Sequence, residues 1–399
     1  MELDVARVRS AFPALEHGVA HFDGPGGSQV PLQVAQAVAD TMCSGISNRG
    51  TVTAAELRAE AVVSQARDAI ADLVGGSAEG VVFGRSMTQL TYDVSRALAK
   101  QWGPGDEVVV SRLDHDGNIR PWVTAAESAG ATVRWADFDR ETAELPVEAV
   151  TQVLSQRARL VAVTGASNLL GTRPDVPAIV EAAHRVGALV YVDGVHLTPH
   201  APIDIGALGA DFFVCSPYKF FGPHHGVLTA DPALLESIEP DKLLPSSSQV
   251  PDRFELGTLP YEVLAGTTAT VDFIAGLASD ATERRARVVE SMTAVEEYED
   301  RLFSRLVDGL SSIDGVTLHG SPKRRTPTAL FSVAGRSPLE AYESLAERGV
   351  NAPASSFYAI EASRWLGLGD TGAVRAGLAP YTNDHDIDLL LAGVAELGR

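Results

Sequence analysis

The sequence is poor in cysteine and in net positive charge, and each shortage excludes a class of protein. Cys43 and Cys215 are the only cysteines in 399 residues, and neither their number nor their spacing suggests a disulfide framework or a structural zinc site. The formal net charge of −20 argues against binding to nucleic-acid phosphates and to anionic membranes. The chain has no apolar run long enough to cross a bilayer and no signal-peptide pattern, so we expect a cytoplasmic protein with no membrane partner.

Lysine is also scarce, with four in the chain, and one of them has unusual neighbours. Lys100, Lys242 and Lys323 lie in polar helix-end or loop contexts. Lys219 instead follows the apolar run 212–215, which is typical of a buried strand. An ammonium among aromatic residues is costly to bury unless it is neutralised or chemically engaged. Such a lysine suits a Schiff base with a carbonyl cofactor, and the alternative is a side chain that reaches into solvent.

From residue 80 onward, apolar runs alternate with helical patterns. The strand candidates are Val81–Phe83, Glu107–Ser111, Thr132–Trp135, Leu160–Thr164, Ala188–Asp193, Asp211–Cys215 and Gly226–Thr229. Helical patterns occupy about 31–43 and 54–74, and then about 88–101, 119–129, 145–157 and 176–186. Nearly continuous apolar runs are typical of strands in a parallel sheet that is covered on both faces. The sequence therefore predicts an α/β fold with a mainly parallel seven-stranded sheet.

The last third of the chain predicts a smaller α+β unit. Helical patterns lie at about 259–278, 281–312, 337–348 and 384–397, and strand candidates at Val316–His319, Ala329–Val333 and Ala373–Leu378. We expect a large domain over 21–265. Residues 1–20 and 266–399 are expected to form the small domain.

Candidate ligand-binding residues, all of them polar except Met87, follow five of the strand candidates. They are Met87 and Thr88, His115, Asn168, Asp193 with His196, and Ser216 with Lys219. Each has an ordinary alternative: Thr88 fits a helix N-cap, Asn168 fits a turn, and both histidines fit plain loops. Ligands of parallel α/β sheets bind beyond the carboxyl ends of the strands, so these side chains are expected to meet in one crevice.

The same residues suit the chemistry of a pyridine-phosphate cofactor. Such a cofactor needs an amine, a carboxylate for the ring nitrogen, donors for the phosphate and a group against the ring face. Lys219 and Asp193 supply the first two, and Thr88 at a helix start favours an anion. His115 suits stacking and proton movement. Arg375, on a later strand-like run, suits a bidentate clamp on a substrate carboxylate.

With these residues in view, the chain resembles fold-type I, PLP-dependent enzymes of the class V aminotransferase family, close to the cysteine desulfurases. The similarity covers nearly the whole chain. The motifs that carry it are Phe22–Gly27, Leu113–Asn118, Ala166–Thr172, Tyr191–His196, Cys215–His224, Arg253–Thr258 and Val374–Leu378. The resemblance implies the PLP-dependent transferase fold of type I, pyridoxal 5'-phosphate as cofactor, an L-amino acid as substrate and no metal.

The resemblance also implies residue roles. Lys219, His115 and Asp193 are expected to be catalytic, and Arg375 and Asn168 to bind substrate. The cofactor contacts are expected from Met87, Thr88, His115, Asn168, Asp193, His196, Ser216, Tyr218, Lys219 and Thr258. Thr258 is expected to reach the phosphate of the neighbouring subunit, which implies a homodimer.

One segment departs from the desulfurase pattern. Desulfurases accept sulfur on a cysteine in a loop of the C-terminal domain, and the corresponding loop here, Arg348–Tyr358, contains none. We therefore predict a C–S lyase that works by β-elimination without a persulfide, with an aminotransferase as the alternative. A nucleotide-dependent enzyme using the Gly24–Gly27 loop is disfavoured, because the glycine pattern is wrong. A non-catalytic scaffold is disfavoured by the intact set of site residues.

Overall fold

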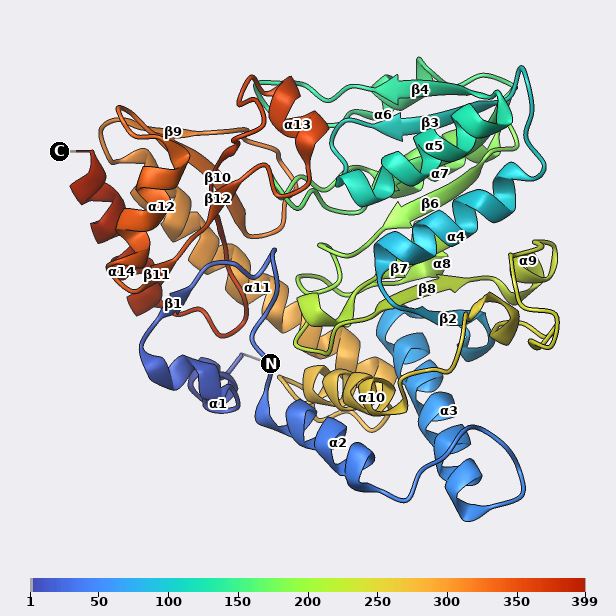
Figure 1. The fold of residues 1–399 in the computed structure, drawn as a ribbon. Coiled ribbons are helices and arrows are strands. Elements are labelled where there is room, and N and C mark those ends of the chain that lie inside the picture. The colour runs from blue at the N-terminus through green and yellow to red at the C-terminus, as the bar shows by residue number, and fades with distance from the viewer. Residues whose placement is uncertain (1–2, 399) are drawn as a thin grey trace.

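The centre of the fold is a seven-stranded sheet with strand order β2-β8-β7-β6-β5-β3-β4 (Figure 1). The computed structural model describes residues 3–398. The strands are β2 (Val81–Gly84), β3 (Glu107–Ser111), β4 (Thr132–Ala136), β5 (Ala158–Thr164), β6 (Leu189–Asp193), β7 (Phe212–Cys215) and β8 (Gly226–Ala230). Strands β3 to β7 pair in parallel, and β8 runs antiparallel to both β2 and β7. The prediction of a mainly parallel seven-stranded sheet is confirmed.

Helices cover both faces of this sheet. Successive side chains of a strand point to opposite faces, so Val108 and Val110 pack in one core cluster while Val109 packs in the other. Helices α4 (Met87–Ala99) and α5 (Arg120–Ala129) cover the first face. Helices α3 (Ala54–Val74), α7 (Val176–His184) and α10 (Tyr261–Ala275) cover the second. Burial on both faces explains why the inner strands read as nearly continuous apolar runs, whereas the edge strand β4 is partly exposed.

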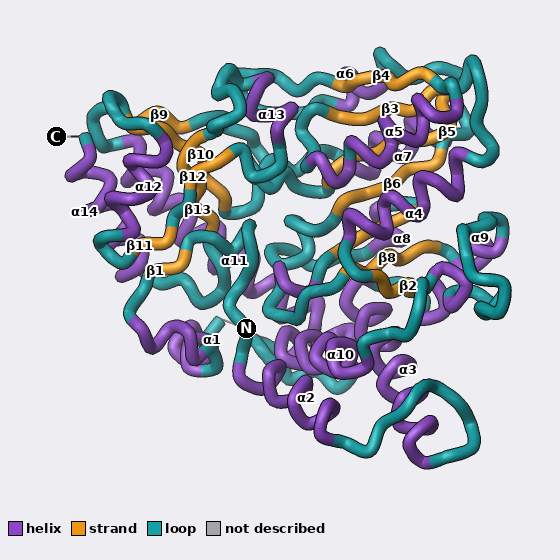
Figure 2. The backbone as a smooth tube through the Cα atoms, viewed as in Figure 1, coloured by secondary structure: helices purple, strands orange, loops and turns teal. Residues whose placement is uncertain are grey.

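A smaller α+β unit follows in the C-terminal part of the chain. Its antiparallel sheet has the order β12-β13-β10-β9. Its strands are β9 (Val316–Leu318), β10 (Thr328–Val333), β12 (Ala354–Ser355) and β13 (Ala373–Gly377). Its helices are α11 (Arg284–Ser311), α12 (Pro338–Ala346), α13 (Ile360–Trp365) and α14 (Asp384–Leu397). Figure 2 shows the two sheets as separate groups of strands, with α11 running from the helices of the large unit toward the small sheet.

Several short elements were not predicted. They are α8 (Ile205–Leu208), α9 (Pro232–Glu236), α13, β12 and a two-stranded pairing of β1 (Ala20–His21) with β11 (Val350–Asn351). Each is too short to show a hydrophobic period. The helix predicted over 145–157 is also shorter in the structure, where α6 spans Val147–Thr151.

The N-terminal segment and α10 both pack against the large unit. Phe12, which follows α1 (Val5–Ser10), lies edge-on to Phe221 and Phe273, with ring centroids 5.6 and 5.4 Å away. Helix α10 runs through residue 265 and packs against α2 (Leu32–Cys43) and α3. The division into 21–265 and the remaining segments stays a prediction about independent units.

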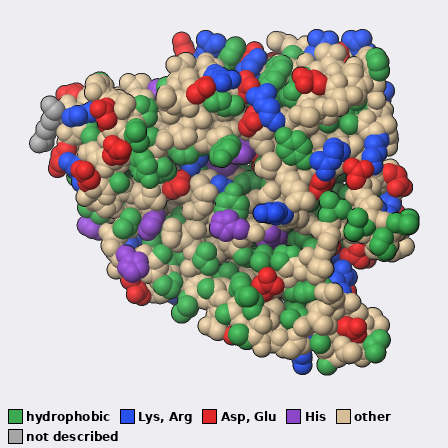
Figure 3. Space-filling model, viewed as in Figure 1, with side chains coloured by type: hydrophobic (Ala, Val, Ile, Leu, Met, Phe, Trp, Pro, Cys, Tyr) green, Lys and Arg blue, Asp and Glu red, His purple; other side chains and the backbone are tan. Residues whose placement is uncertain are grey.

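The surface mixes charges of both signs. Acidic and basic side chains are interspersed over the face of the molecule that Figure 3 shows. Among residues 3–398, no helix is long and apolar enough to cross a membrane, and no cluster of three His, Cys, Asp or Glu side chains could hold a metal ion.

Candidate active site

A cavity of about 630 Å³ lies where the carboxyl ends of the parallel strands face the small unit. Its size is typical of a site for a small molecule. It is lined by Met87, Thr88, His115, Asn168, Asp193, His196, Ser216, Tyr218, Lys219 and Arg375. Every predicted site residue except Thr258 is therefore in its wall. The expectation that the strand ends meet in one crevice agrees with this geometry.

Lys219 ends a 3₁₀ turn, Pro217–Lys219, that follows β7. Its Nζ donates hydrogen bonds to the backbone oxygens of Pro25, at 2.5 Å, and Gly26, at 2.9 Å. Burial, with the positive charge of Arg375 adding to it, lowers the pKa of Lys219 to about 7. The glycine-rich loop thus supplies carbonyl oxygens to the lysine, and near neutral pH the amine is partly deprotonated and nucleophilic.

This pKa predicts how cofactor attachment depends on pH. The folded-state pKa lies below that of free lysine, so the neutral amine dominates above about pH 7. The rate at which cofactor-free protein attaches pyridoxal phosphate is expected to rise through pH 7 and to level off above it. The rate can be followed by borohydride trapping between about pH 5 and 10. A midpoint near 10 would show that the lysine keeps its ordinary basicity.

Asp193 ends β6, and its Oδ1 accepts a hydrogen bond from the backbone N–H of Val195 at 2.9 Å. Burial raises the pKa of Asp193 to about 6, although that N–H and Lys219 oppose the rise. The next residue is a glycine for a steric reason: a Cβ on Gly194 would lie 1.9 Å from the ring of Phe213. The strand end therefore holds a carboxylate in the cavity wall, and this carboxylate suits a protonated ring nitrogen.

The first turn of α4 forms the part of the wall that suits a phosphate. Ser86 caps this helix, because its Oγ accepts from the N–H of Gln89 at 3.1 Å. Thr88 is therefore not the N-cap, and it lies in the first turn beside Met87. The N–H groups of a first turn have no partner within the helix and favour an anion. A Cβ on Gly226 would lie 2.4 Å from the nitrogen of Met87, so β8 can pass directly behind this turn only with glycine there.

His115 is held as a neutral ring. Its Nδ1 accepts from the N–H of Gly117 at 2.9 Å, which leaves the ring proton on Nε2. Burial, reinforced by the charges of Lys219 and Arg375, lowers the pKa of His115 to about 4. At neutral pH this histidine is therefore a hydrogen-bond donor through Nε2 and a weak base.

Three residues in the cavity wall hold buried polar atoms that have no partner within residues 3–398. They are Asn168 Oδ1, His196 Nδ1 and Arg375 Nε. The opposite nitrogen of His196 lies 2.9 Å from Thr328 Oγ1 and 3.0 Å from Thr326 Oγ1. Buried polar groups normally have partners, so atoms of this kind in a cavity wall fit a bound molecule that supplies them.

Arg375 is less free than the predicted bidentate clamp requires. Its Nη1 donates to the backbone oxygen of Asn168 at 2.9 Å, and its Nη2 pairs with Asp23 Oδ1 at 2.7 Å. The guanidinium carbon lies 3.7 Å from the ring centroid of Phe357. Both terminal nitrogens therefore already have a partner. Sequence reasoning singled out the motif that contains Asp23 but did not connect it with this arginine.

The loop that carries no cysteine covers the cavity. Asn168 Nδ2 donates to the backbone oxygen of Phe357 at 2.9 Å, and the N–H of Asp116 donates to the backbone oxygen of Tyr358 at 2.7 Å. Phe357 and Tyr358 both have left-handed backbone conformations, with φ of 52° and 59°. Tyr358 is 77% exposed, and the centroid of its ring lies 5.6 Å from that of His115. Apart from the missing cysteine, no sequence pattern indicates these contacts.

No thiol reaches the cavity. Cys43 is exposed on α2, and Cys215 is buried at the end of β7, where burial raises the pKa of its thiol. Thr258 is exposed and lies outside the cavity wall. Its predicted role at a neighbouring subunit stays a prediction.

The residues in this cavity fit pyridoxal phosphate. They offer an amine, a buried carboxylate, the N–H groups of a helix start and unpartnered nitrogen and oxygen atoms in the wall. An α/β fold with such a site defines a PLP-dependent enzyme of fold type I.

Comparison with known proteins agrees with this assignment. The family description aminotransferase class-V matches residues 20–390, and the chain belongs to that family. An uncharacterised protein of Mycobacterium tuberculosis is 37% identical over 100% of both chains, and an aminotransferase-like protein of Gibberella zeae is 31% identical over 98% of this chain and 97% of its own. The crystal structure of the cysteine desulfurase CsdA from Escherichia coli superposes with a TM-score of 0.88 at 25% identity, over 100% of this chain and 99% of that one. The protein is a PLP-dependent enzyme, a lyase or a transferase.

Proposed function

We propose that this enzyme cleaves the C–S bond of a cysteine-derived L-amino acid by β-elimination, without a persulfide on the protein. The observation that supports this most directly is a desulfurase-like fold whose cavity contains Lys219, Asp193 and Arg375 but no cysteine. In the net reaction, water and an S-substituted cysteine give a thiol, pyruvate and ammonia. The Cα–H and Cβ–S bonds break, and no external oxidant or reductant is needed.

The protonation states of Lys219 and His115 assign them different roles in the reaction. When bound, pyridoxal phosphate supplies a carbonyl for the substrate amine and a ring that draws electrons from Cα. Lys219, with a pKa of about 7, is a better base for the Cα proton than His115, with a pKa of about 4. His115 instead donates through Nε2. Arg375 Nε and Asn168 Oδ1 are the free polar atoms beside which the substrate would be oriented.

A substrate panel tests this proposal. Enzyme loaded with pyridoxal phosphate is mixed with cysteine, S-substituted cysteines and other L-amino acids, and thiol, pyruvate, ammonia and keto-acid products are measured. Thiol and pyruvate in equal amounts from a cysteine derivative are the expected result. Transfer of the amino group to a keto acid without pyruvate release would overturn elimination. That outcome would favour the alternative, transamination, which the aminotransferase-like relative supports.

We also propose that two copies of the chain form a homodimer in which Thr258 reaches the neighbouring cavity. Exposed large apolar side chains support this arrangement, because many lie on the segments 30–57 and 243–256. They are Val30, Leu32, Met42, Val52, Leu57, Leu243, Leu244 and Leu256. The Arg49–Asp252 ion pair, at 2.9 Å, brings the two segments together, and an exposed apolar patch is typical of a surface that another protein covers. Leu256, which is 50% exposed, lies only two residues before Thr258.

The homodimer predicts a specific mutant effect. Leu256→Glu would place a charge in the subunit contact, so the dimer Kd is expected to rise by about 100-fold. Leu339→Glu is the matched control, since Leu339 is 60% exposed on α12, far along the chain from these segments. Sedimentation velocity of both variants measures the effect. Dissociation of neither variant, or of both equally, would contradict the placement of the contact.

A further inference from the structure

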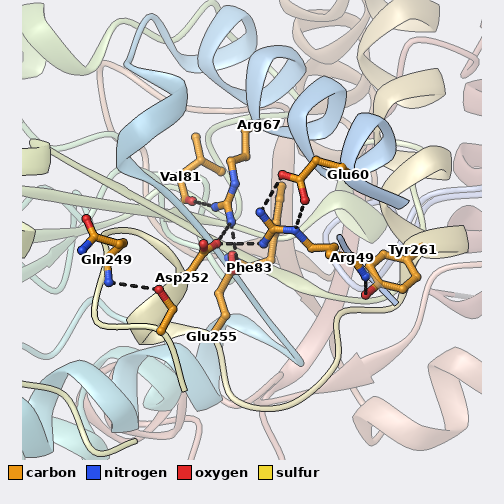
Figure 4. A network of polar contacts seen from close by, with 10 residues as sticks. Arg49, Glu60, Arg67, Val81, Phe83, Gln249, Asp252, Glu255 and Tyr261 are labelled. Carbon is orange, nitrogen blue, oxygen red and sulfur yellow. Dashed lines mark hydrogen bonds and ion pairs between the residues drawn. The ribbon is translucent and has the colours of Figure 1, made fainter. Parts of the chain in front are cut away.

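A buried network of charges joins α3 to β2 and to the segment that precedes Thr258 (Figure 4). Arg67 of α3 is 7% exposed, and its Nη2 donates to Asp252 Oδ1 and to Glu255 Oε2, both at 2.9 Å. Its Nη1 donates to the backbone oxygen of Val81. Glu255 is 8% exposed, and its second oxygen accepts the backbone N–H of Phe83 at 3.0 Å.

These contacts supply the backbone hydrogen bonds that a neighbouring strand would otherwise make with β2. Strand β2 is at the edge of the sheet and pairs only with β8. Val81 and Phe83 are two residues apart, so their backbone polar groups point to the same side of the strand. On that side Arg67 takes the carbonyl and Glu255 takes the N–H. Without the pair, two buried backbone groups would lose their partners, and such groups are costly to leave unsatisfied.

The strand that the pair completes leads into the phosphate end of the cavity. Strand β2 ends at Gly84, and Ser86, Met87 and Thr88 follow as the cap and first turn of α4. A shift of β2 along its free edge would therefore move the N–H groups of this turn. The turn is closely packed against β8 at Gly226, so even a small shift of β2 would disturb the position of these N–H groups.

The same two carboxylates hold the segment 252–258. Asp252 receives hydrogen bonds from both Arg67 and Arg49, each at 2.9 Å. Arg49 is in turn held by both oxygens of Glu60, at 2.8 and 2.9 Å. Thr258 follows Glu255 by three residues and is exposed. The buried Arg67–Glu255 pair therefore connects two parts of the chain. One is the first turn of α4, in the cavity wall of the same subunit, and the other is the segment 252–258, which ends at the exposed Thr258.

We infer that Arg67 and Glu255 are a positioning pair, which sets the affinity for the cofactor's phosphate by holding the start of α4 and the Thr258 segment in register. This inference rests on the proposed homodimer for the role of Thr258. Neither residue lines the cavity, so the pair acts only through the elements that it fixes.

Cofactor affinity in matched variants tests the pair. Glu255→Gln keeps an acceptor for the N–H of Phe83 but removes the negative charge beside Arg67. The Kd for pyridoxal phosphate is expected to rise by about tenfold, and the ³¹P resonance of the bound phosphate is expected to shift. Asp252→Asn, a milder change on the same segment, is expected to raise this Kd about threefold. Glu107→Gln is the control, because Glu107 is a buried carboxylate that pairs with Arg134 and Arg157, contacts no member of this network and does not line the cavity.

A double variant tests the connection to Thr258. The double variant combines Glu255→Gln with Thr258→Ala. If both residues act on the same phosphate, the fold increase in its Kd for pyridoxal phosphate should be smaller than the product of the fold increases in the two single variants. A Glu255→Gln protein that is folded and keeps the wild-type Kd and ³¹P resonance would overturn the inference, and so would losses that multiply. Failure of the wild-type protein to bind pyridoxal phosphate would instead overturn the cofactor site itself, so the two failures are distinguishable.

Discussion

Replacing Lys219 with alanine is expected to lower turnover by about 10³-fold or more and to abolish covalent attachment of the cofactor. The reason is that one amine performs two tasks. It is the nucleophile in the cavity with a pKa near neutrality, and it is the stronger of the two bases beside the substrate. Mass spectrometry after borohydride treatment measures attachment, and pyruvate or keto-acid release measures turnover.

The control for this variant is Lys323→Ala, because Lys323 is an exposed lysine outside the cavity wall. It should retain attachment and turnover. Unchanged function of Lys219→Ala would contradict the role given to this amine and would support a scaffold. Retained attachment at another residue would show that a different amine enters the cavity.

Replacing Asp193 with asparagine is the second large change, with turnover expected to fall by about 100-fold. Asparagine keeps the size of the side chain and an oxygen that can accept the N–H of Val195. It removes the negative charge that would hold a proton on the cofactor's ring nitrogen, which the ring needs to draw electrons from Cα. Turnover measured together with the absorption spectrum of the bound cofactor separates a loss of chemistry from a loss of binding.

Asp114 provides a matched control for Asp193. Both carboxyl groups are buried, and both lie at the carboxyl end of a strand of the same sheet. Asp193 ends β6 and Asp114 follows β3, but Asp114 does not line the cavity. Burial raises the pKa of Asp114 to about 8, so its carboxyl group is already mostly neutral at pH 7. Asp114→Asn therefore removes little charge and should change turnover far less. Equal losses in both variants would indicate a structural effect and contradict the electronic role of Asp193.

The two variants also bear on the choice between lyase and transferase. Both reactions begin with removal of the Cα proton, so Lys219→Ala and Asp193→Asn should impair either one. They differ in what happens at Cβ. Phe357 and Tyr358, on the loop that lacks a cysteine, line the cavity in which this step would take place. The product analysis, rather than either variant, separates the two reactions.

The sheet and most of the site could be read from the sequence because they depend on local patterns. Burial on both faces makes most strands apolar runs, and the first polar residues after a run mark the edge where ligands bind. This is how Thr88, His115, Asp193 and Lys219 could be placed in one crevice before the structure was known. The short elements α8, α9 and β11 could not be found, because two to five residues do not establish a period.

The sequence by itself determined the order of the strands along the chain, the side chains that follow them and the absence of a cysteine from the loop at 348–358. Only the tertiary structure decided that Asp23 pairs with Arg375, that Phe357 lies against that guanidinium, and that Glu255 completes the free edge of β2 with Arg67. The physical reason is separation along the chain. A strand or a cap is set by residues a few positions apart, whereas these contacts join residues far apart in sequence, and only the packing of one element on another brings them within bonding distance.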